Sequence, residues 1–415
     1  MKYGLIGEKM GHSFSKEIHN KLLDYDYELK EIEPEDLEKF ITDKDFSAIN
    51  ETIPYKEMFI PYLDFVSDTA KKIGAVNTIV NKNGKLYGYN TDFFGLKSLI
   101  LKSGIDLSGK KVLILGSGGT SKTAYAVAQN LNAREIYKVS RKKIEGYITY
   151  KEIKNHTDTE IIINTTPSGM YPNIENSPLD LRDFTNLQGV VDVIYNPLQT
   201  KLVNSAKQKG IKAVCGLYML VAQAVYAAEK FTEKEVPQSK IDEIFQIIFK
   251  SNQNIVLVGM AGCGKTTVGK KLAEELNLKF IDTDEEIVKK YGVITDIFKT
   301  KGEKVFRDYE SEVVREVSTL QGYIIATGGG VVLRQENTDL LKLNGKVYFL
   351  DRPLNKLVAT DDRPLSSNRN DLEKRFYERY DTYLNCCDVR IVSDGEVEDT
   401  LNSIRKDFLN ENFSS

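Results

Sequence analysis

Residues 259–267 read Gly259-Met260-Ala261-Gly262-Cys263-Gly264-Lys265-Thr266-Thr267. This run fits the pattern G-x-x-x-x-G-K-[ST], with an apolar, β-branched run at 255–258 before it and a helical pattern at 268–276 after it. Strand, glycine loop and helix in this order predict a phosphate-binding loop, in which backbone N–H groups and the helix N-terminus bind phosphate oxygens. We expect Lys265 to reach the β- and γ-phosphates and the Thr266 hydroxyl to bind Mg²⁺. A glycine loop without a ligand is the alternative, but Lys-Thr directly after the loop has no packing purpose.

The position of this loop divides the chain. A first strand of this kind normally opens its domain, yet here it begins beyond residue 250. We therefore expect the residues before it to form a separate unit, joined to it by a polar linker at 251–254. The length of 415 residues fits about three domains.

The composition is that of an ordinary globular chain, with 41% hydrophobic and 28% charged residues. A net charge of −3 gives no nucleic-acid signature, and no apolar run approaches the roughly 20 residues that a membrane-spanning helix needs. The N-terminal residues lack the apolar core of an export signal. Four cysteines are too few and too irregularly spaced for a disulfide framework. We expect a cytoplasmic protein that binds neither nucleic acid nor membrane.

A second glycine loop precedes this region by more than a hundred residues. It reads Gly116-Ser117-Gly118-Gly119-Thr120-Ser121. A buried strand is predicted before it at 111–115 and a helix after it at 122–131, so the loop is close to the dinucleotide-binding fingerprint. The next predicted strand, 135–139, ends in Ser140-Arg141-Lys142, where an NAD site usually has an acidic residue. Two cations suit a ribose 2′-phosphate and favour NADP over NAD, with a solvated basic turn as the alternative.

Other short apolar runs predict an α/β fold for the whole first half. Strands are predicted at 2–6, 27–32, 47–52, 160–164, 190–195 and 212–215, with a hairpin at 77–89 that turns at Asn83-Gly84. From 111 onward, strands alternate with helical patterns, which is typical of a parallel, doubly wound sheet.

Several polar side chains stand at element ends in this half. Lys56 comes just past the strand at 47–52, where open α/β sheets commonly carry catalytic groups. Ser13 and Ser15 stand at a predicted helix start, and there they are either ligands or helix caps. Gln223 lies on a predicted helix at 219–229.

Seven short motifs follow one another along residues 1–250. They are His12-Ser13-x-Ser15, Asn50-x-Thr52-x-Pro54-x-Lys56, Gly74-Ala75-Val76-Asn77, Asn90-Thr91-Asp92, Gly116-Ser117-Gly118-Gly119, Asn164-Thr165-Thr166-Pro167 and Gly216-Leu217-Tyr218-Met219-Leu220-x-x-Gln223. In order and spacing they resemble the shikimate dehydrogenase family. The resemblance implies a substrate domain at 1–103 plus 224–250 and a Rossmann-like NADP-binding domain at 104–223.

The same resemblance implies roles for individual residues. Substrate binding falls to Ser13, Ser15, Thr52, Asn77, Asn90, Asp92 and Gln223. Catalysis falls to Lys56 and Asp92, and cofactor binding to Gly116, Ser117, Gly118, Gly119, Thr120, Ser140, Arg141 and Lys142. Glu51, Lys16 and Ser140 depart from the family pattern, Glu51 standing where an apolar residue is usual, but none of these changes removes a ligand.

The residue types suit the reduction of a ketone on a small polyhydroxylated acid. A charged Lys56 can give a proton to the developing alkoxide, with Asp92 orienting it. Short hydroxyls and amides are suitable partners for substrate hydroxyls.

The second half carries acidic and basic groups around its loop. A strand predicted at 279–281 ends in Asp282 and Asp284, and two carboxylates spaced by one residue at a strand end face the same way. They are interpreted as a Mg²⁺ partner and an acceptor for a substrate hydroxyl, with an acidic helix N-terminus as the alternative. Arg307 is predicted on one helix with Glu303, one turn away. Strands are also predicted at 323–326, 346–350 and 389–392.

This half, residues 253–412, resembles the shikimate kinase family through the 259–267 loop, Asp282-x-Asp284, Gly302-Glu303-x-x-Phe306-Arg307, Gly328-Gly329-Gly330, Arg363-Pro364-Leu365 and Arg379. The resemblance implies a P-loop kinase domain at 254–412 with a five-stranded parallel sheet. It implies that shikimate is held by Asp284, Arg307, Arg379, Gly328, Gly329 and Gly330, and that Asp282 and Thr266 support Mg²⁺. ATP binding falls to Gly259, Gly262, Cys263, Gly264, Lys265, Thr266, Thr267 and Arg363. The segment from Leu357 to Arg363 is short and carries no second cation, so a reduced lid over ATP is expected.

These observations lead to one main hypothesis and two alternatives. The chain is expected to be a bifunctional enzyme that reduces 3-dehydroshikimate to shikimate with NADPH and phosphorylates shikimate with ATP and Mg²⁺, with Lys265 and Asp284 as catalytic residues of the second step. One alternative is a quinate-type, NAD-using dehydrogenase fused to another small-molecule kinase, and Arg141-Lys142 argues against NAD. The other is a nucleotide-sensing regulator, against which the intact Lys56, Asp92 and Lys265 argue.

Overall fold

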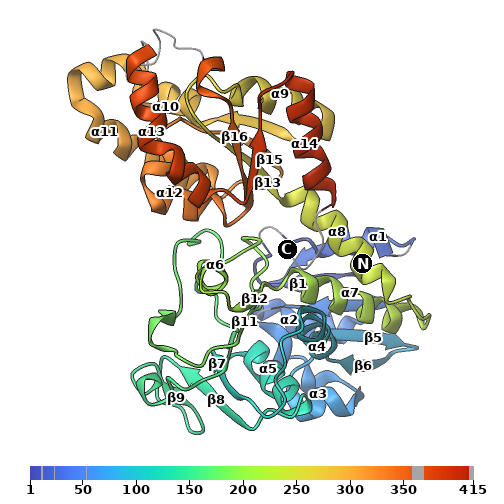
Figure 1. The fold of residues 1–415 in the computed structure, drawn as a ribbon. Coiled ribbons are helices and arrows are strands. Elements are labelled where there is room, and N and C mark those ends of the chain that lie inside the picture. The colour runs from blue at the N-terminus through green and yellow to red at the C-terminus, as the bar shows by residue number, and fades with distance from the viewer. Residues whose placement is uncertain (11–12, 23, 53, 358–368, 411–415) are drawn as a thin grey trace. The chain divides into compact units, whose positions relative to one another are not determined.

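The computed structural model describes residues 1–10, 13–22, 24–52, 54–357 and 369–410 (Figure 1). The chain forms two compact units. The first comprises Met1–Met170, Asn176–Asn196 and Ser205–Ile248, and the second comprises Tyr171–Glu175, Pro197–Asn204 and Phe249–Ser415. Among the described helices, none combines the length and the apolar character that crossing a membrane requires.

The first sheet of the N-terminal unit is mixed. Its strands are β1 (Tyr3–Gly7), β2 (Tyr27–Glu31), β3 (Ala48–Glu51), β4 (Phe65–Val66), β5 (Thr78–Lys82) and β6 (Lys85–Tyr89), in the order β2-β1-β3-β5-β6-β4. β1 pairs in parallel with β2 and β3, while β5 pairs antiparallel with β3 and β6. The predicted turn at Asn83-Gly84 is confirmed, and both residues have positive φ, 54° and 82°, as the tight hairpin turn requires.

The second sheet of this unit is parallel throughout. It contains β7 (Lys111–Leu115), β8 (Glu135–Ser140), β9 (Ile148–Thr149), β10 (Ile161–Asn164), β11 (Gly189–Asp192) and β12 (Lys212–Val214), in the order β12-β11-β10-β7-β8-β9. All five residues of β7 are buried, as expected for a strand covered on both faces. The predicted doubly wound α/β sheet is therefore confirmed.

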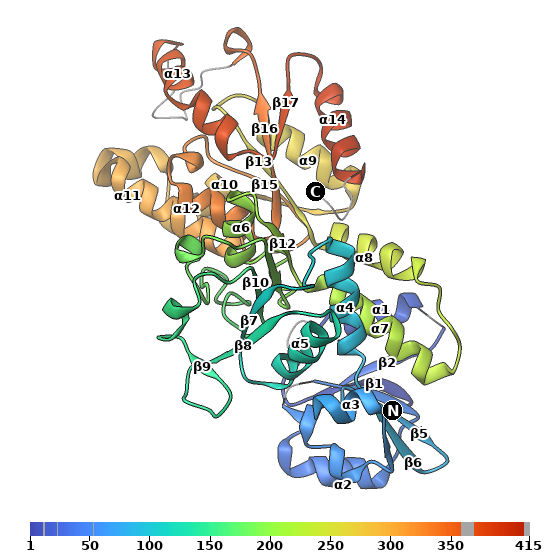
Figure 2. The ribbon, with the colours of Figure 1, turned by 60° about the horizontal axis from the view of Figure 1, so that its bottom comes forward.

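Eight α-helices accompany the two sheets in the described part of the N-terminal half. They are α1 (Ser15–Leu22), α2 (Leu37–Asp43), α3 (Asp68–Ile73), α4 (Asp92–Ser103), α5 (Gly119–Asn130), α6 (Lys201–Gln208), α7 (Leu217–Thr232) and α8 (Ser239–Asn252). α4 and α7 pack side by side (Figure 2). Gly95 makes this close approach possible, because a Cβ there would lie 2.7 Å from the Met219 carbonyl oxygen.

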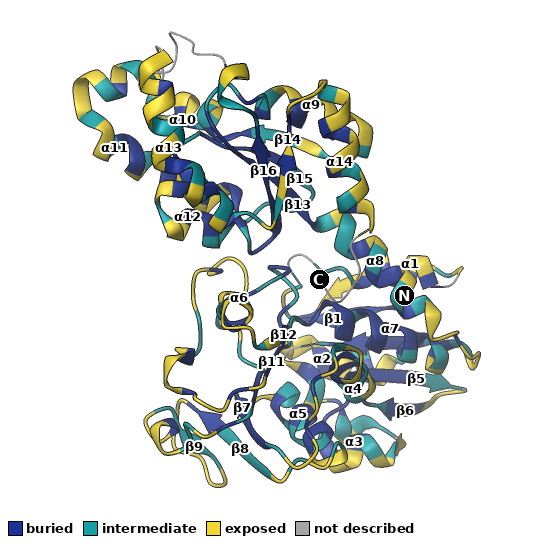
Figure 3. Ribbon diagram, in the orientation of Figure 1, coloured by how far each residue is buried: buried dark blue, intermediate teal, exposed yellow. Residues whose placement is uncertain are grey.

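The C-terminal unit has the five-stranded parallel sheet that was predicted. Its strands are β13 (Asn254–Val258), β14 (Lys279–Asp282), β15 (Tyr323–Ala326), β16 (Gly345–Asp351) and β17 (Val389–Val392), in the order β14-β15-β13-β16-β17. The described helices are α9 (Lys265–Leu276), α10 (Thr283–Tyr291), α11 (Ile294–Val317), α12 (Gln335–Leu341), α13 (Arg369–Cys386) and α14 (Val397–Asn410), and they cover both faces (Figure 1). β13 is central and fully buried (Figure 3).

One local expectation is wrong. The polar stretch at 251–254 is not an irregular linker, because α8 continues to Asn252 and β13 begins at Asn254.

The prediction that Glu303 and Arg307 lie one turn apart on one helix is confirmed, since both belong to α11 and form an ion pair at 3.3 Å. Just before them α11 is bent at Gly302, whose φ of 80° is non-helical. Glycine tolerates this conformation without a Cβ clash.

Asn254 was assigned to the polar linker, but its side chain has a structural role. Its side chain is completely buried, donates to the Leu320 carbonyl at 2.7 Å and accepts the Tyr323 N–H at 2.9 Å. It therefore links the start of β13 to the start of β15 by a hydrogen bond.

We predict that Asn254→Ala lowers the free energy of unfolding of the C-terminal unit by about 2 kcal/mol, because two buried backbone groups lose their partner. Urea unfolding followed by hydrogen exchange of peptides from β13 and β15 measures this. The control Asn402→Ala, at an exposed position of α14, should stay within about 0.5 kcal/mol. Equal stability of the two variants would contradict the prediction.

Candidate functional site

The centre of the N-terminal site is an ion pair between Lys56 and Asp92. Lys56 lies in a short 3-10 turn, Tyr55–Glu57, that follows β3, and Asp92 is the first residue of α4. The Lys56 Nζ lies 2.5 Å from the Asp92 Oδ2, and the two side chains are 15% and 9% exposed. The strand-end position predicted for Lys56 brings a cation and an anion into contact at a partly dry place, where their attraction is stronger than in water.

A buried amide and hydroxyl network adjoins this pair. The Asn77 side-chain oxygen accepts the Thr91 N–H at 2.7 Å, and its NH₂ group donates to the Thr91 hydroxyl at 3.0 Å and to the Gln223 oxygen at 3.5 Å. Three separate segments, before β5, before α4 and within α7, thus meet here. The sequence prediction included Asn77 and Gln223 but gave Thr91 no role, although Thr91 stands inside the Asn90-Thr91-Asp92 motif.

Other predicted substrate ligands make contacts within the fold. Asn90 accepts the Phe93 N–H and donates to the Ala75 carbonyl, both at 3.0 Å. The Ser13 hydroxyl accepts the Ser15 N–H at 3.2 Å at the start of α1. The Ser13 contact favours the capping interpretation that was the alternative for Ser13 and Ser15. Substrate binding by Ser13, Ser15, Asn90 and the half-buried Thr52 stays a prediction.

A second cluster of buried polar side chains adjoins this network, and the sequence did not predict it. The Tyr27 hydroxyl donates to the Asn50 side-chain oxygen at 2.8 Å, and Asn50 donates to the Thr78 hydroxyl at 3.0 Å. His19 stacks on Tyr27 with ring centroids 3.9 Å apart and contacts the Tyr25 hydroxyl at 2.6 Å. Burial lowers the pKa of His19 to about 3, so this ring is neutral.

The glycine loop after β7 lies next to the ion pair. Gly116 has a φ of 120°, and a Cβ there would lie 2.5 Å from the Thr165 hydroxyl. A Cβ on Gly118 would meet open space, and one on Gly119 would lie 3.7 Å from the Lys56 side chain. The loop can therefore bring backbone N–H groups to a dinucleotide beside Lys56, which fits the predicted cofactor.

The cationic turn predicted to select NADP follows β8. Ser140 is buried and its hydroxyl accepts the Lys142 N–H at 3.2 Å, while Arg141 and Lys142 are exposed. Exposed guanidinium and ammonium groups at this strand end are free to reach a phosphate in solution.

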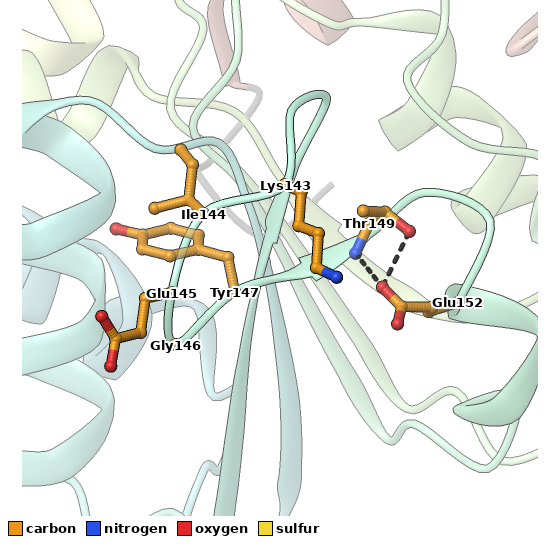
Figure 4. A pocket seen from close by; sticks show the side chains of 7 residues that line it. All are labelled: Lys143, Ile144, Glu145, Gly146, Tyr147, Thr149 and Glu152. Carbon is orange, nitrogen blue, oxygen red and sulfur yellow. Dashed lines mark hydrogen bonds between the residues drawn. The ribbon is translucent and has the colours of Figure 1, made fainter.

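A cavity of about 700 Å³ lies just beyond this turn (Figure 4). Its lining includes Lys143, Tyr147 and the carboxylates of Glu145 and Glu152. Glu152 accepts the Thr149 N–H at 2.6 Å, which lowers the pKa of its carboxyl and keeps it negative. Two anions disfavour a phosphate here, and the predicted cofactor residues do not line this cavity.

The phosphate-binding loop of the C-terminal unit has the predicted form. α9 begins at Lys265, directly after Gly264, whose φ is 98°. Lys265 is 8% exposed, and its ammonium donates to the carbonyls of Gly259 and Met260 at 2.9 and 3.0 Å. A cation beside a glycine loop at a helix N-terminus makes this loop a suitable binding site for anions.

The two aspartates face this loop in a different way from the prediction. Asp282 ends β14 and caps α10, accepting the Asp284 N–H at 3.0 Å and the Thr266 hydroxyl at 2.8 Å. Asp284 lies in the first turn of α10, so the pair is not arranged by strand alternation. A hydroxyl and a carboxylate this close are a suitable oxygen donor set for Mg²⁺.

Arg307 is held by carboxylates on α11. Its guanidinium donates to both Glu310 oxygens at 2.8 Å and to Glu303 at 3.3 Å. Glu310 is fully buried, and burial raises the pKa of its carboxyl while Arg307 opposes that shift. A Cβ on Gly330 would lie 2.2 Å from the guanidinium, so a larger residue there would displace the Arg307 side chain.

The glycine loop at 328–330 also contacts α13. Arg379 donates to the Gly329 carbonyl at 3.1 Å, and the Tyr383 hydroxyl donates to the same oxygen. A Cβ on Gly328 would lie 2.5 Å from the Asp284 Oδ1. Burial lowers the pKa of Arg379. The sequence prediction gave Tyr383 no role, although a hydroxyl four residues after Arg379 on the same helix is the signal that relates them.

One cavity of about 950 Å³ joins these groups. Its lining includes Ala261, Gly262, Gly264, Lys265, Thr266, Thr267, Asp282, Asp284, Arg307, Gly328, Gly329, Gly330 and Arg379. The predicted Arg363 and the rest of the expected lid lie outside the described residues. The cavity brings an anion-binding loop, carboxylates and two guanidinium groups around one space.

Family models match both halves of the chain. A model for the shikimate dehydrogenase substrate binding domain matches residues 5–79, and a model for shikimate kinase matches residues 261–408. The NADP(+)-dependent shikimate dehydrogenase of Clostridium beijerinckii is 38% identical over 263 residues, which are 59% of this chain and 97% of that protein.

Solved structures are similar to the N-terminal part. Shikimate dehydrogenase 1 from Peptoclostridium difficile is 39% identical with a TM-score of 0.56, covering 60% of this chain and 98% of that one. Shikimate 5-dehydrogenase from Thermus thermophilus, solved with NADP(H) and shikimate, is 27% identical with a TM-score of 0.55, covering 60% and 99%.

The neutral state of His19 predicts a pH dependence of stability. Its pKa is about 3 in the folded chain against an ordinary 6.5, so below pH 6.5 the unfolded chain binds a proton that the folded chain does not. The contribution is complete above pH 6.5 and is lost as the pH falls towards 3, at up to about 1.4 kcal/mol per pH unit.

His19→Phe keeps a ring on Tyr27 and should remove this part of the slope. Urea midpoints between pH 7 and pH 4, followed by hydrogen exchange of peptides from β1 to β3, measure it. The half-buried His156 is the matched control, and His156→Phe should change the slope less. An unchanged slope in His19→Phe would show that His19 does not titrate on unfolding.

Proposed function

Since the chain belongs to the shikimate dehydrogenase family and carries a shikimate kinase domain in its C-terminal part, it is a bifunctional shikimate-pathway enzyme, and we propose that it catalyses two consecutive steps. The first is the reduction of 3-dehydroshikimate to shikimate with NADPH. The second is the transfer of phosphate from ATP to the 3-hydroxyl of shikimate.

The observation that carries this proposal is the Lys56–Asp92 pair at 2.5 Å beside the glycine loop. A ketone that receives a hydride becomes an alkoxide and needs a proton at the same carbon's oxygen. Lys56 gives this proton from its Nζ, and Asp92 orients the ammonium and accepts a substrate hydroxyl. NADPH, when bound, supplies the hydride.

The remaining predicted ligands surround the same place. Ser13, Ser15, Thr52, Asn77, Asn90 and Gln223 are proposed to bind the hydroxyl and carboxylate groups of the substrate. Thr91 is added as a positioning residue, because it holds the Asn77 amide by both of its ends. A fixed amide loses less freedom when the substrate binds.

The second step uses the cavity of the C-terminal unit. Asp284 accepts the hydrogen bond of the attacking hydroxyl, and Lys265 neutralises charge on the transferred group. Arg307 and Arg379 pair with the substrate carboxylate, for which a guanidinium has the right fork geometry. Thr266 and Asp282 hold Mg²⁺, which when bound neutralises charge on the ATP phosphates.

The proposed domains follow from these sites. Residues 1–103 and 224–250 form the substrate domain of the reductase, and residues 104–223 form its NADP domain. Residues 254–412 form the kinase, with Arg363 proposed to approach the phosphates.

A single reaction tests both steps. The full chain is incubated with 3-dehydroshikimate, NADPH and ATP, and the products are resolved by mass. Shikimate 3-phosphate is expected from the unaltered chain. Lys56→Ala should lower the rate of NADPH oxidation by roughly 10²–10⁴, the range for loss of a general acid, and leave phosphorylation of added shikimate intact.

The matched variant in the other site is Asp284→Asn. It should accumulate shikimate without phosphate, because the first step is unaffected and ATP binding through the 259–267 loop remains. Absence of shikimate in every reaction would overturn the reductase assignment. Shikimate that is never phosphorylated by the unaltered chain would overturn the kinase assignment.

Cofactor choice is a separate prediction. Replacing Arg141 and Lys142 together by glutamine and methionine should raise the KM for NADPH at least tenfold while changing the KM for NADH little, because only NADPH carries the 2′-phosphate. The control Lys143→Met removes a neighbouring exposed cation and should have a smaller effect. Equal effects on both cofactors would show that Arg141 and Lys142 do not contact the 2′-position.

A further inference from the structure

Tyr383 is a buried tyrosine whose hydroxyl reaches the wall of the C-terminal cavity. It lies near the end of α13, it is completely buried, and its ring stacks on Phe349 of β16 with centroids 5.0 Å apart. Its hydroxyl donates to the Gly329 carbonyl oxygen. Arg379, one turn earlier on the same helix, donates to the same oxygen at 3.1 Å. Two side chains of α13 thus share one backbone acceptor.

The two donors have different access to the cavity. A carbonyl oxygen has two lone pairs, so it can accept both hydrogen bonds at once. Arg379 lines the cavity of about 950 Å³, whereas Tyr383 is not among the described residues that line it. Tyr383 can therefore influence a bound molecule only through the Gly329 carbonyl and Arg379.

Arg379 depends on this acceptor more than Arg307 depends on any single partner. Arg307 is held by both oxygens of Glu310 and by Glu303. Within the described part of the chain Arg379 forms no ion pair, and the Gly329 carbonyl is the acceptor that holds its guanidinium. The position of this one oxygen therefore determines where the guanidinium lies.

The Gly329 carbonyl is itself fixed from two sides. On one side Gly329 lies against the phosphate-binding loop, since a Cβ there would be 3.3 Å from the Ala261 nitrogen. On the other side the Tyr383 hydroxyl holds the carbonyl oxygen. The stack on Phe349 leaves the tyrosine ring little freedom, so the hydroxyl is a rigid donor.

We propose that Tyr383 is a positioning residue of the kinase, which fixes the Gly329 carbonyl so that Arg379 presents its remaining N–H groups to the carboxylate of the substrate. This inference rests on the proposed kinase function. A guanidinium binds a carboxylate by two parallel hydrogen bonds only when its plane is correctly oriented. Tyr383 therefore contributes to the preference of the site for an anionic substrate.

The variant Tyr383→Phe keeps the ring on Phe349 and removes only the hydroxyl. The KM for shikimate should rise about tenfold, the effect of losing one hydrogen bond of ordinary strength. The kcat and the KM for ATP should stay within about twofold, because the carboxylate contact is the same in the ground state and the transition state. Initial rates of phosphorylation by the full chain measure these constants.

The matched control is Tyr380→Phe, on the same helix. The Tyr380 hydroxyl donates to the Asp351 carboxylate at 2.9 Å, so this variant also loses one tyrosine hydrogen bond. Its KM for shikimate should stay within about twofold of the unaltered value. An equal rise of this KM in both variants would show a general loss of packing and would overturn the proposal.

A neutral substrate distinguishes orientation of Arg379 from a structural effect. The methyl ester of shikimate has no anionic carboxylate, so its kcat/KM should be nearly unchanged in Tyr383→Phe, while that of shikimate falls about tenfold. A purely structural effect would lower both values by the same factor. In the background Arg379→Gln, adding Tyr383→Phe should raise the KM for shikimate no further, and independent additive effects would overturn the action through Arg379.

Failure of the kinase function is distinguishable from failure of this inference. A chain that never phosphorylates shikimate overturns the proposed reaction, and calorimetric titration with shikimate alone then tests Tyr383. A Kd about tenfold higher in Tyr383→Phe supports the positioning role, and equal Kd values overturn it. No binding of shikimate by the unaltered chain would overturn both proposals.

Discussion

The contact between Lys56 and Asp92 is the interaction on which the N-terminal unit depends. Neither charge could be buried alone at acceptable cost, so the end of β3 and the start of α4 must be held together. The Asn77–Thr91 hydrogen bonds fix the approach to α4, and Gly95 lets α7 pack against it. The packing of this unit is therefore arranged to keep one ion pair partly dry and correctly oriented.

In the C-terminal unit, too, buried charged side chains have partners within the chain. Arg307 is neutralised by Glu310 within α11, and Arg379 is engaged by the Gly329 carbonyl. Each guanidinium thus has a partner in the chain before a substrate binds. A carboxylate entering the cavity meets preorganised donors, and little side-chain freedom is lost on binding.

Much of the fold could be predicted because apolar runs bounded by glycines are unambiguous. The strands predicted at 111–115, 323–326 and 389–392 agree with the structure at both ends. Helix starts were predicted too late, as at α5, because glycines in a first turn carry no helical pattern. The order and spacing of the polar motifs along the chain could also be identified from the sequence.

The remaining features depend on tertiary contacts that spacing does not encode. The Asn254 side chain forms hydrogen bonds with two backbone groups of other segments. Its polar character therefore reflects these contacts and does not mark a linker. His19 and Tyr27 form a buried stack that only the packing of α1 on β2 creates. The burial of Glu51 depends on the packing of the segments around it, so the sequence alone does not distinguish it from a surface glutamate.

The direct connection of α8 to β13 determines how the chain can be taken apart. A protease needs several exposed, irregular residues, and Gln253 is 4% exposed between a helix and a strand. Residues 233–238 are irregular and, apart from the buried Val236, exposed. Cleavage there leaves α8 held to α4 and α7 through Asp242, which contacts Lys102 and Tyr218. Cleaved fragments would remain a non-covalent complex, so the two activities are not exchangeable modules that one cut can release.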